Sequence, residues 1–400
     1  MSRKARYFAC AFFAVGSAAF AATYSFPTAV APSGSVFVPA SAPAKTAALP
    51  PAPPKSQAST LSAPDFSAVD AAFQASQIVN GTLIIGTADG VIHEYTKGNF
   101  QPDKAYPIAS SSKWLTATLL VRMAQAGKLS LGDHPYPKLS YWTSSAGDPR
   151  SQVTLGQTLS MTSGFNATPL DITCVNNGLV TLQACAQTIY NGGIDTAPGS
   201  TFSYGPEHPQ IAAAIAEAAG GKSFNQLFAE YVTTPLGMGC TRFVESITSV
   251  LLHTTGRACN YAYAANANTW AAGGAVSSAR DYAKLLHAFM GTSFITDMDG
   301  FLAPRTLTLQ RGFIPGSVAS SDWHYALGSW NECDSTSWNS ICAADKINSA
   351  AGAYGWMPWI DRKNGYFALI ATRIVVGSGD ATSVPVEQQL QPLIVAALQP

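Results

Sequence analysis

The spacing of apolar residues predicts the elements at the start of the folded region. Apolar side chains recur at near-helical intervals over residues 65–78, which predicts a helix. Two apolar runs, residues 82–86 and 91–95, flank Ala88-Asp89-Gly90, a sequence typical of a hairpin turn. Residues 110–126 carry an apolar stripe of helical period, and a glycine suited to a helix C-cap follows. We therefore expect a helix, a β-hairpin and a second helix.

The pattern becomes irregular in the middle of the chain and returns to strands near its end. Residues 130–270 are rich in loops, and the clearest helix there is the alanine-rich run 210–219. Residues 355–361 and 366–375 flank an Asn-Gly turn and predict a second hairpin, and residues 385–398 predict a closing helix. Strands at both ends indicate an α+β fold. Its antiparallel sheet would be built from both termini and flanked by helices, with a mostly helical region inserted.

The segment before these elements differs in composition. Residues 23–64 are rich in Pro, Ala and Ser and hold nine of the 25 prolines of the chain. Such a segment cannot bury enough apolar surface to order itself, so we expect a disordered tether. One folded domain is expected to follow over residues 65–400.

The first 22 residues are typical of an export signal. A basic start precedes the apolar residues 7–20, and Ala19-Phe20-Ala21 fits the small-x-small rule for cleavage. The apolar stretch is short for a membrane span, and the alternative is an uncleaved anchor. Residues 1–22 are therefore predicted to be a signal peptide. The protein is expected to be periplasmic or secreted, with no stable membrane span.

Composition and charge narrow the classes of partner. Hydrophobic residues make up 47% of the chain and charged residues 12%, which is ample for a large core. The 23 Lys and Arg residues balance 23 Asp and Glu residues. Because neither a net charge nor a run of like charge is present, binding to nucleic acid or to an anionic membrane is not expected.

Six cysteines remain once Cys10, inside the apolar signal, is set aside. They form three pairs that are close in sequence: Cys174 and Cys185, Cys240 and Cys259, Cys333 and Cys342. An even number in an exported chain predicts disulfides, and six cysteines allow 15 connectivities. We favour the neighbouring pairs because each closes a local loop. The chain has no Cys-x-x-Cys and its histidines are scattered, so no metal and no cofactor are expected.

Ser110 and Lys113 form the first candidate for chemistry. They are three residues apart at the start of the expected helix, so their side chains share one helix face. The intervening Ser111 and Ser112 point elsewhere. A buried lysine loses its proton more readily, and helix N-terminal N–H groups can stabilise an oxyanion. Taken alone, the alternative is a capping serine beside a solvated lysine.

Further segments match one family in the same order along the chain. They are Gly127–Asp133, Thr154–Leu155, Leu159–Phe165, Pro198–Tyr204, Pro235–Met238 and Gly273–Tyr282. Over residues 66–398 the chain therefore resembles the serine beta-lactamase and penicillin-binding-protein group, which includes class C beta-lactamases and family VIII carboxylesterases. The resemblance implies a beta-lactamase/transpeptidase-like fold and an acyl-enzyme on Ser110.

The resemblance also implies a second catalytic residue, Tyr204. Its phenol would move protons between Ser110, the leaving group and water, which calls for a tyrosine perturbed by a neighbouring cation. The group often has Tyr-x-Asn here, whereas this chain has Pro206 at the third position. His208, four residues after the tyrosine, is interpreted as a hydrogen-bonded or exposed histidine and not as a catalytic group.

The third motif of the group is matched loosely by Ser349–Gly355, which resembles the esterase form of the motif. The backbone N–H groups of Ala353 and Ser110 would then form an oxyanion hole. The expected substrate contacts are Ala350, Ala351, Gly352 and Tyr354. The aromatic residues Trp114, Tyr354 and Trp356 would shape an acyl pocket, or else belong to the core.

The favoured function is a carboxylesterase, because the third motif has no evident cation for a substrate carboxylate. The substrate would be a small ester, amide or beta-lactam-like molecule. One alternative is a beta-lactamase or D-alanyl-D-alanine carboxypeptidase of the same fold. Another is an inactive protein that binds cell-wall fragments or a partner. The absence of Gly-x-Ser-x-Gly and of His-Glu-x-x-His disfavours an α/β-hydrolase and a metalloprotease.

Overall fold

The computed structural model covers most of the chain beyond the expected tether. It describes residues 63–165, 174–175, 177–244, 255–260, 268–307, 310–319, 321–374 and 378–399. The expected signal peptide, residues 1–22, and all but the last two residues of the tether, residues 23–64, lie outside the described part. No helix of the described part is both long enough and apolar enough to cross a membrane.

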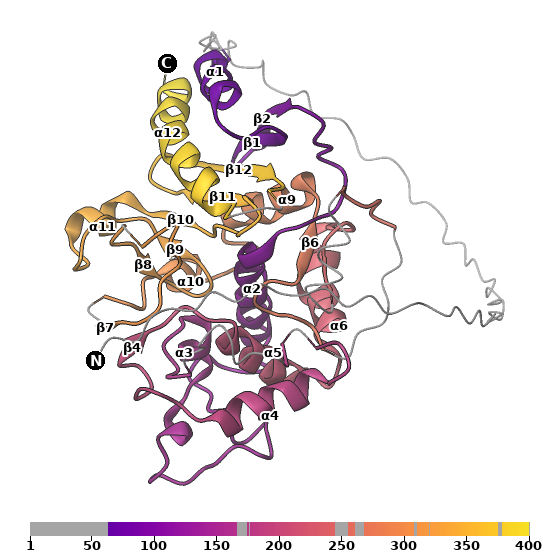
Figure 1. Ribbon diagram of the computed structural model, residues 1–400. Coiled ribbons are helices and arrows are strands. Elements are labelled where there is room, and N and C mark those ends of the chain that lie inside the picture. Colours follow the sequence, from indigo (N-terminus) through magenta and orange to yellow (C-terminus); the bar gives the residue numbers. More distant parts are fainter. Residues whose placement is uncertain are drawn as a thin grey trace, which may run out of the picture. The chain divides into compact units, whose positions relative to one another are not determined.

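A seven-stranded sheet is the central element of the fold (Figure 1), and all its strand pairs are antiparallel. Its strands, in spatial order, are β2 (Gly90–Lys97), β1 (Gly81–Thr87), β12 (Tyr366–Thr372), β11 (Met357–Asp361), β10 (Ile347–Ser349), β9 (Trp330–Asn331) and β8 (His324–Tyr325). β1 pairs with β12 from Gly81–Thr372 to Thr87–Tyr366. The sheet therefore joins the two ends of the folded region, which confirms the predicted architecture.

Helices cover both faces of this sheet. α9 (Ala279–Phe289) contacts β1, β2, β11 and β12, while α12 (Asp380–Leu398) contacts β11 and packs against α1 (Ser67–Ala75). Successive strand residues point to opposite faces. Accordingly, Ile84 belongs to the core on the α9 side, and its neighbours Leu83 and Ile85 belong to the core that contains α1 and α12. Figure 1 shows α1 and α12 side by side.

The inserted region packs around α2 (Ser112–Gln125), whose first turn carries the candidate nucleophile. α5 (Glu207–Gly220) contacts α2 and the smaller helices α3 (Leu155–Leu159), α4 (Leu182–Gly192) and α6 (Phe224–Phe228). Its alanine-rich sequence lets neighbouring helices approach closely, and Ile211 through Ala216 are buried. Other short α-helices in the described part are α7 (Thr234–Leu236), α10 (Met298–Leu302) and α11 (Ser340–Asp345).

Within the described residues, two small sheets lie outside the main one. β3 (Tyr106–Pro107), β6 (Ala275–Ser277) and β5 (Arg242–Phe243) form an antiparallel sheet beside the nucleophile turn. β4 (Thr201–Phe202) pairs in parallel with β7 (Gln310–Arg311). These strands of two or three residues are too short to produce a periodic sequence pattern, so the sequence did not predict them.

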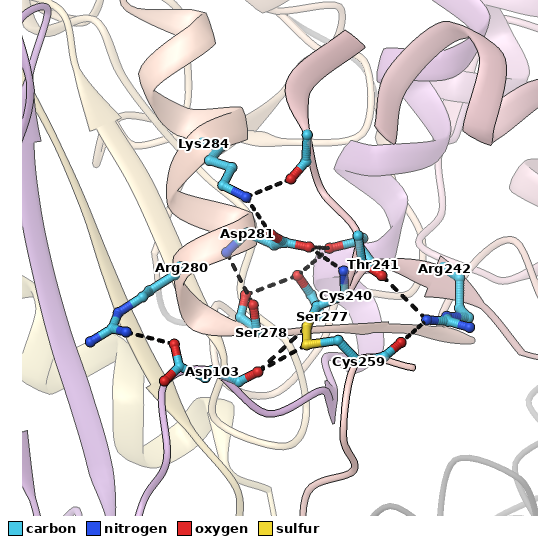
Figure 2. Close-up of a disulfide and its surroundings, with 12 residues drawn as sticks. Asp103, Cys240, Thr241, Arg242, Cys259, Ser277, Ser278, Arg280, Asp281 and Lys284 are labelled. Atoms are coloured by element: carbon cyan, nitrogen blue, oxygen red, sulfur yellow. Dashed lines mark hydrogen bonds and ion pairs between the residues drawn. A yellow bond between two sulfur atoms is a disulfide. The ribbon is translucent and has the colours of Figure 1, made fainter. Parts of the chain in front are cut away.

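Three disulfides join the cysteines as neighbouring pairs: Cys174–Cys185, Cys240–Cys259 and Cys333–Cys342. Figure 2 shows the second pair beside Asp281 of α9. The Asp281 carboxylate accepts a hydrogen bond from the Cys240 backbone N–H at 2.6 Å and pairs with Lys284 at 2.8 Å. The disulfide is thus connected to the start of a core helix through a buried carboxylate.

The closing helix is longer than predicted. It begins at Asp380, not at residue 385, and contains Pro385 and Pro392. The predicted helix started at Pro385, a residue that is tolerated in the first turn of a helix but is unfavourable further inside it. A proline in the second turn removes one backbone hydrogen bond, and burial of Val384, Val386 and Leu390 against the sheet compensates for that loss.

Candidate active site

A strained turn presents Ser110 at the start of α2. A short 3₁₀ turn, Ala109–Ser111, leads into the helix, and Ala109 adopts a positive φ of 46°. This conformation is unfavourable for a residue with a Cβ, and such strain tends to occur at functional sites. The Lys113 Nζ atom donates a hydrogen bond to Ser110 Oγ at 3.0 Å. The predicted Ser-x-x-Lys contact is therefore formed.

The neighbouring serines hold the turn in place and face away from Lys113. Ser111 Oγ donates to the carbonyl of Ala350 at 2.6 Å, which links the turn to the sheet. Ser112 Oγ donates to the carbonyl of Ala109 at 2.5 Å and accepts from the Ala275 N–H at 3.0 Å. Both side chains are fully buried. They position Ser110 without sharing its chemistry.

Lys113 is buried and held in a defined position. Its ammonium also donates to the carbonyl of Ala272 at 2.9 Å and lies 4.5 Å from the ring centre of Tyr204. Burial lowers the pKa of Lys113 to about 7, and the nearby carboxylate of Glu207 opposes this shift. A substantial fraction of Lys113 is therefore neutral near pH 7 and able to accept a proton from Ser110.

Tyr204 lies on the other side of Ser110. Its ring stacks on Trp330 with centres 5.6 Å apart. Burial raises the pKa of Tyr204 above its ordinary value, and a hydrogen bond with the Ser110 side chain partly offsets this. The expected neighbouring cation, Lys113, is present at the face of the ring, but burial raises the pKa of the phenol instead of lowering it. Its phenol stays protonated at neutral pH, and Lys113 is the group that titrates near pH 7.

The Gly273–Tyr282 segment holds the nucleophile turn in place through hydrogen bonds to its backbone. Tyr282 donates its hydroxyl to the carbonyl of Ser111 at 3.0 Å, and the carbonyl of Ala275 accepts from the Ile108 N–H at 3.1 Å. Gly274 lies close to neighbouring backbone, so a side chain there would clash with the carbonyl of Val244. The residues that the sequence comparison singled out thus fix the geometry of the turn.

The third-motif segment runs beside Ser110 in extended pairing with β11. Beyond β10, the Ala350 N–H donates to the carbonyl of Pro358 at 3.1 Å, and the Gly352 N–H donates to that of Trp356 at 2.8 Å. A Cβ at Gly352 would lie 2.2 Å from the Ile108 carbonyl oxygen, so only glycine permits this close approach.

Only some of the expected substrate contacts line the cavity at Ser110. Ala351 lines the cavity at Ser110, and so does Ala353, the expected oxyanion donor. Ala350 is buried in the core, Gly352 packs against backbone, and Tyr354 packs with Ala105, Val244 and Val276. The structure thus corrects the expectation for Ala350, Gly352 and Tyr354, which do not line this cavity.

Of the two alternatives for the aromatic residues, acyl pocket or core, the core holds for Trp114 and Trp356. Trp114 and Trp356 are fully buried in the core, whereas Trp330 and Phe313 line the cavity. This cavity has a volume of about 190 Å³, and its lining residues are Ser110, Tyr204, Phe313, Pro315, Ser317, Val318, Trp330, Ala351, Ala353 and Asp380. None of these described lining residues is Lys, Arg or His.

Sequence reasoning missed one wall of the cavity, the segment from Phe313 to Val318. Backbone pairing joins it to the Tyr204 segment. The Gly312 N–H donates to the carbonyl of Phe202 at 2.6 Å, and the Tyr204 N–H donates to that of Phe313 at 2.8 Å. A contact between segments more than 100 residues apart leaves no local signal in the sequence.

His208 has the structural role that was predicted. It is fully buried, its Nδ1 atom lies 2.7 Å from Ser163 Oγ, and its Nε2 atom lies 2.9 Å from the carbonyl oxygen of Ser203. Burial lowers the pKa of His208 to about 4, so it is neutral at physiological pH. The histidine fixes the Tyr204 segment to the Thr162-Ser163-Gly164 segment.

A cavity of about 590 Å³ lies elsewhere, against Glu332, Asp334 and Asp345. It is larger than the one at Ser110 but is not lined by Ser110, Lys113 or Tyr204. Because the nucleophile and its base define the chemistry, we assign the candidate active site to the smaller cavity. Among the described residues, no group of three His, Cys, Asp or Glu side chains could hold a metal ion.

Comparison with known proteins relates this chain to a known family. Protein flp of Staphylococcus aureus strain MW2 is 25% identical over 172 residues, which are 42% of this chain and 34% of that protein. The match thus spans about a third of the length of this curated relative.

Solved structures with a similar fold cover most of this chain. A candidate beta-lactamase from Bacteroides dorei DSM 17855 has a TM-score of 0.67 at 22% identity, covering 83% of this chain and 99% of that one. EstCE1, described as a hydrolase with promiscuous acyltransferase activity, has a TM-score of 0.63 at 18% identity, covering 81% and 96%. The family model described as Beta-lactamase matches residues 66–390. The chain therefore belongs to the Beta-lactamase family of serine hydrolases.

Proposed function

We propose that this protein is an exported carboxylesterase that acts through an acyl-enzyme on Ser110. The observation that carries the proposal is the 3.0 Å contact between Ser110 Oγ and the buried amine of Lys113, at the edge of a cavity. A hydroxyl next to an amine whose pKa is about 7 is an activated nucleophile at neutral pH.

In the first step, Ser110 Oγ attacks the carbonyl carbon of the ester and its proton passes to Lys113 Nζ. The negative charge that develops on the carbonyl oxygen would be stabilised by the N–H groups of Ser110 and Ala353. Among the described residues, no carbonyl accepts from the Ala353 N–H, so this donor is available to a substrate.

In the second step, the bond to the alcohol breaks and the alkoxide takes a proton. In this proposal the protonated phenol of Tyr204, which hydrogen-bonds the Ser110 side chain, donates this proton and is then reprotonated at the expense of Lys113. Water then attacks the acyl-enzyme, with its proton moving along the same groups, and the acid is released. The cycle returns Ser110 and Lys113 to their starting protonation states.

The lining of the cavity favours esters over beta-lactams and D-alanyl peptides. Those substrates carry a carboxylate, whereas the described lining residues include no cation. Phe313, Val318 and Trp330 offer apolar surface for an acyl group. The fold of EstCE1, a hydrolase with acyltransferase activity, agrees with acyl transfer as the reaction type.

Ser110→Ala is expected to lower kcat by about 1000-fold or more on a short p-nitrophenyl ester, because the acyl-enzyme can no longer form. Initial rates for the wild type and the variant, on this ester and on a chromogenic cephalosporin, test this. Circular dichroism of Ser110→Ala controls for damage to the fold, and Ser144→Ala, at an exposed serine that does not line the cavity, is the matched control variant. Full ester turnover by Ser110→Ala would refute the assignment, and fast cephalosporin turnover would favour a beta-lactamase.

The export part of the proposal is supported by the predicted signal peptide and by the three disulfides. Protein recovered from the periplasm or medium is expected to begin near residue 23 and to contain no free thiol, since Cys10 is removed with the signal. Intact mass before and after alkylation measures both properties. An unprocessed chain with alkylated cysteines, retained in the cytoplasm, would contradict export.

A further inference from the structure

Asp380 places a carboxylate in the wall of the cavity that contains Ser110. It is the first residue of α12, is 8% exposed and lines the cavity. It is also the only charged side chain among the described lining residues. Asp380 could not be predicted as a site residue, because nothing in the local sequence distinguishes it from any aspartate near the start of a helix.

The carboxylate is fixed relative to the reacting atoms. Ser317 donates a hydrogen bond to Asp380 Oδ2 at 2.5 Å, and Ser378 donates to Oδ1. The preceding Gly379 N–H donates to the carbonyl of Ala353 at 2.8 Å, which ties the start of α12 to the expected oxyanion donor. Each carboxylate oxygen retains a lone pair after these bonds, so the group can accept further hydrogen bonds from a ligand.

The other lining residues complete a surface suited to a positively charged ligand. Trp330, Tyr204 and Phe313 bring aromatic rings to the same cavity, and aromatic rings attract ammonium groups. The negative charge of Asp380 acts across the cavity, since it helps to keep the Tyr204 phenol protonated. An anion in such a confined space attracts a cation and repels a second anion strongly.

We propose that Asp380 selects ester substrates that carry an ammonium group on the acyl chain and rejects those that carry a carboxylate. This inference rests on the proposed esterase function of Ser110 and specifies its substrate class. The ammonium would donate hydrogen bonds to Asp380 while the ester carbonyl lies at Ser110. The alternative is that Asp380 only stabilises the first turn of α12 and the Ser317 loop.

Three p-nitrophenyl esters of matched acyl length distinguish these roles. Butyrate ends in a methyl group, β-alanine in an ammonium and succinate in a carboxylate. The ratio of kcat/KM for β-alanine to that for butyrate is expected to exceed one in the wild type and to fall about 10-fold or more in Asp380→Asn. The corresponding ratio for succinate is expected to rise in the variant.

Asp89→Asn is the matched control, because Asp89 is exposed in the turn between β1 and β2. It removes one negative charge from the surface and should leave both ratios unchanged. A purely structural Asp380 would alter thermal stability and all three kcat/KM values together, without changing their ratios. That outcome, or equal changes in both variants, would overturn the inference.

A measurement on the wild type keeps the test independent of how well Asp380→Asn folds. n-Butylammonium and n-butyrate are compared as competitive inhibitors of butyrate ester cleavage, and the ammonium is expected to inhibit at lower concentration. If no ester is cleaved, the esterase proposal fails. The same two ions can then be compared as protectors of Ser110 against a fluorophosphonate probe. Equal protection, or better protection by butyrate, would overturn the role of Asp380 separately.

Discussion

Two residues with opposite pKa shifts decide how Ser110 is activated. Burial favours the neutral form of both Lys113 and Tyr204, and this shifts their pKa values in opposite directions. For Lys113 the neutral form is the base, and its pKa falls to about 7. For Tyr204 the neutral form is the acid, and its pKa rises. The same desolvation therefore prepares one group to accept a proton and the other to donate one.

Glu207 is expected to tune this balance. Its carboxylate raises the pKa of Lys113 and so opposes the effect of burial. In the wild type, kcat/KM for a neutral ester should rise with pH around a midpoint near 7, as Lys113 loses its proton. Glu207→Gln removes the anion, so the pKa of Lys113 falls further and the midpoint moves to lower pH.

A pH–rate profile from pH 5 to pH 9 measures this midpoint. Glu230→Gln, which replaces an exposed carboxylate paired with Lys222, is the control and should leave the profile in place. A midpoint that stays unchanged or moves upward in Glu207→Gln would show that Lys113 is not the titrating base.

Local spacing explains which site residues could be predicted from the sequence. Ser110 and Lys113 lie within one helical turn, so their contact follows from helix geometry alone. Tyr204 could be found only through family resemblance, because it comes from another segment. Asp380 and Phe313 reach the cavity through tertiary packing and through two-residue strands. Neither arrangement leaves a periodic or spaced pattern to detect.

At the scale of elements, the active site depends on the close approach of the third-motif segment to the nucleophile turn. Gly352 lies against the carbonyl of Ile108, and Ser111 donates to the carbonyl of Ala350. These contacts set the distance between the two proposed oxyanion donors. An error of about 1 Å in such a site can reduce the rate about 100-fold.

Gly352→Ala is expected to push these elements apart, because its Cβ would lie 2.2 Å from the Ile108 carbonyl oxygen. We expect kcat to fall about 10-fold to 100-fold while the protein remains folded. Steady-state kinetics and thermal unfolding measure the two effects. Gly291→Ala is the matched control, since no described atom lies within 4 Å of the added Cβ. Unchanged kcat in Gly352→Ala would refute the requirement for this contact.

Element prediction succeeded where the periodic pattern was long enough. The hairpin of β1 and β2 and the helices α2 and α5 follow from residues that alternate or recur every third to fourth position. The start of α12 was misplaced by five residues, because the helix contains Pro385 in its interior, where proline is ordinarily unfavourable. β8 and β9 contain two residues each, and burial among aromatic rings holds them in place.

At the scale of the whole molecule, a buried pair of carboxylates links the main sheet to α12. Glu332 follows β9, and Glu387 lies in α12. The side-chain amide of Gln391 donates a hydrogen bond to each carboxylate. Burial and repulsion by Glu332 raise the pKa of Glu387 well above its ordinary value, and burial likewise raises that of Glu332. Each raised pKa means that the protonated form is favoured by folding.

The sign of the pH dependence follows from these shifts. In the unfolded chain both groups lose their protons near pH 4.5, the ordinary value for glutamate. Below that pH the groups are neutral in both states, and the folded state bears no penalty. As the pH rises toward 7 and above, the unfolded state is deprotonated first, so the free energy of unfolding decreases. Removing one of the two charges should therefore stabilise the protein at high pH and have little effect at low pH.

Glu387→Gln tests this account, because the amide keeps an acceptor for Gln391 and carries no charge. We expect the Tm of the variant to match that of the wild type at pH 5 and to exceed it by about 3–5 °C at pH 8. Differential scanning calorimetry at both pH values measures the difference, with the exposed Glu230→Gln as control. A variant less stable than the wild type at pH 8 would mean that the pair is ionised and stabilised by contacts that outweigh its repulsion. The link between β9 and α12 would then strengthen as the pH rises.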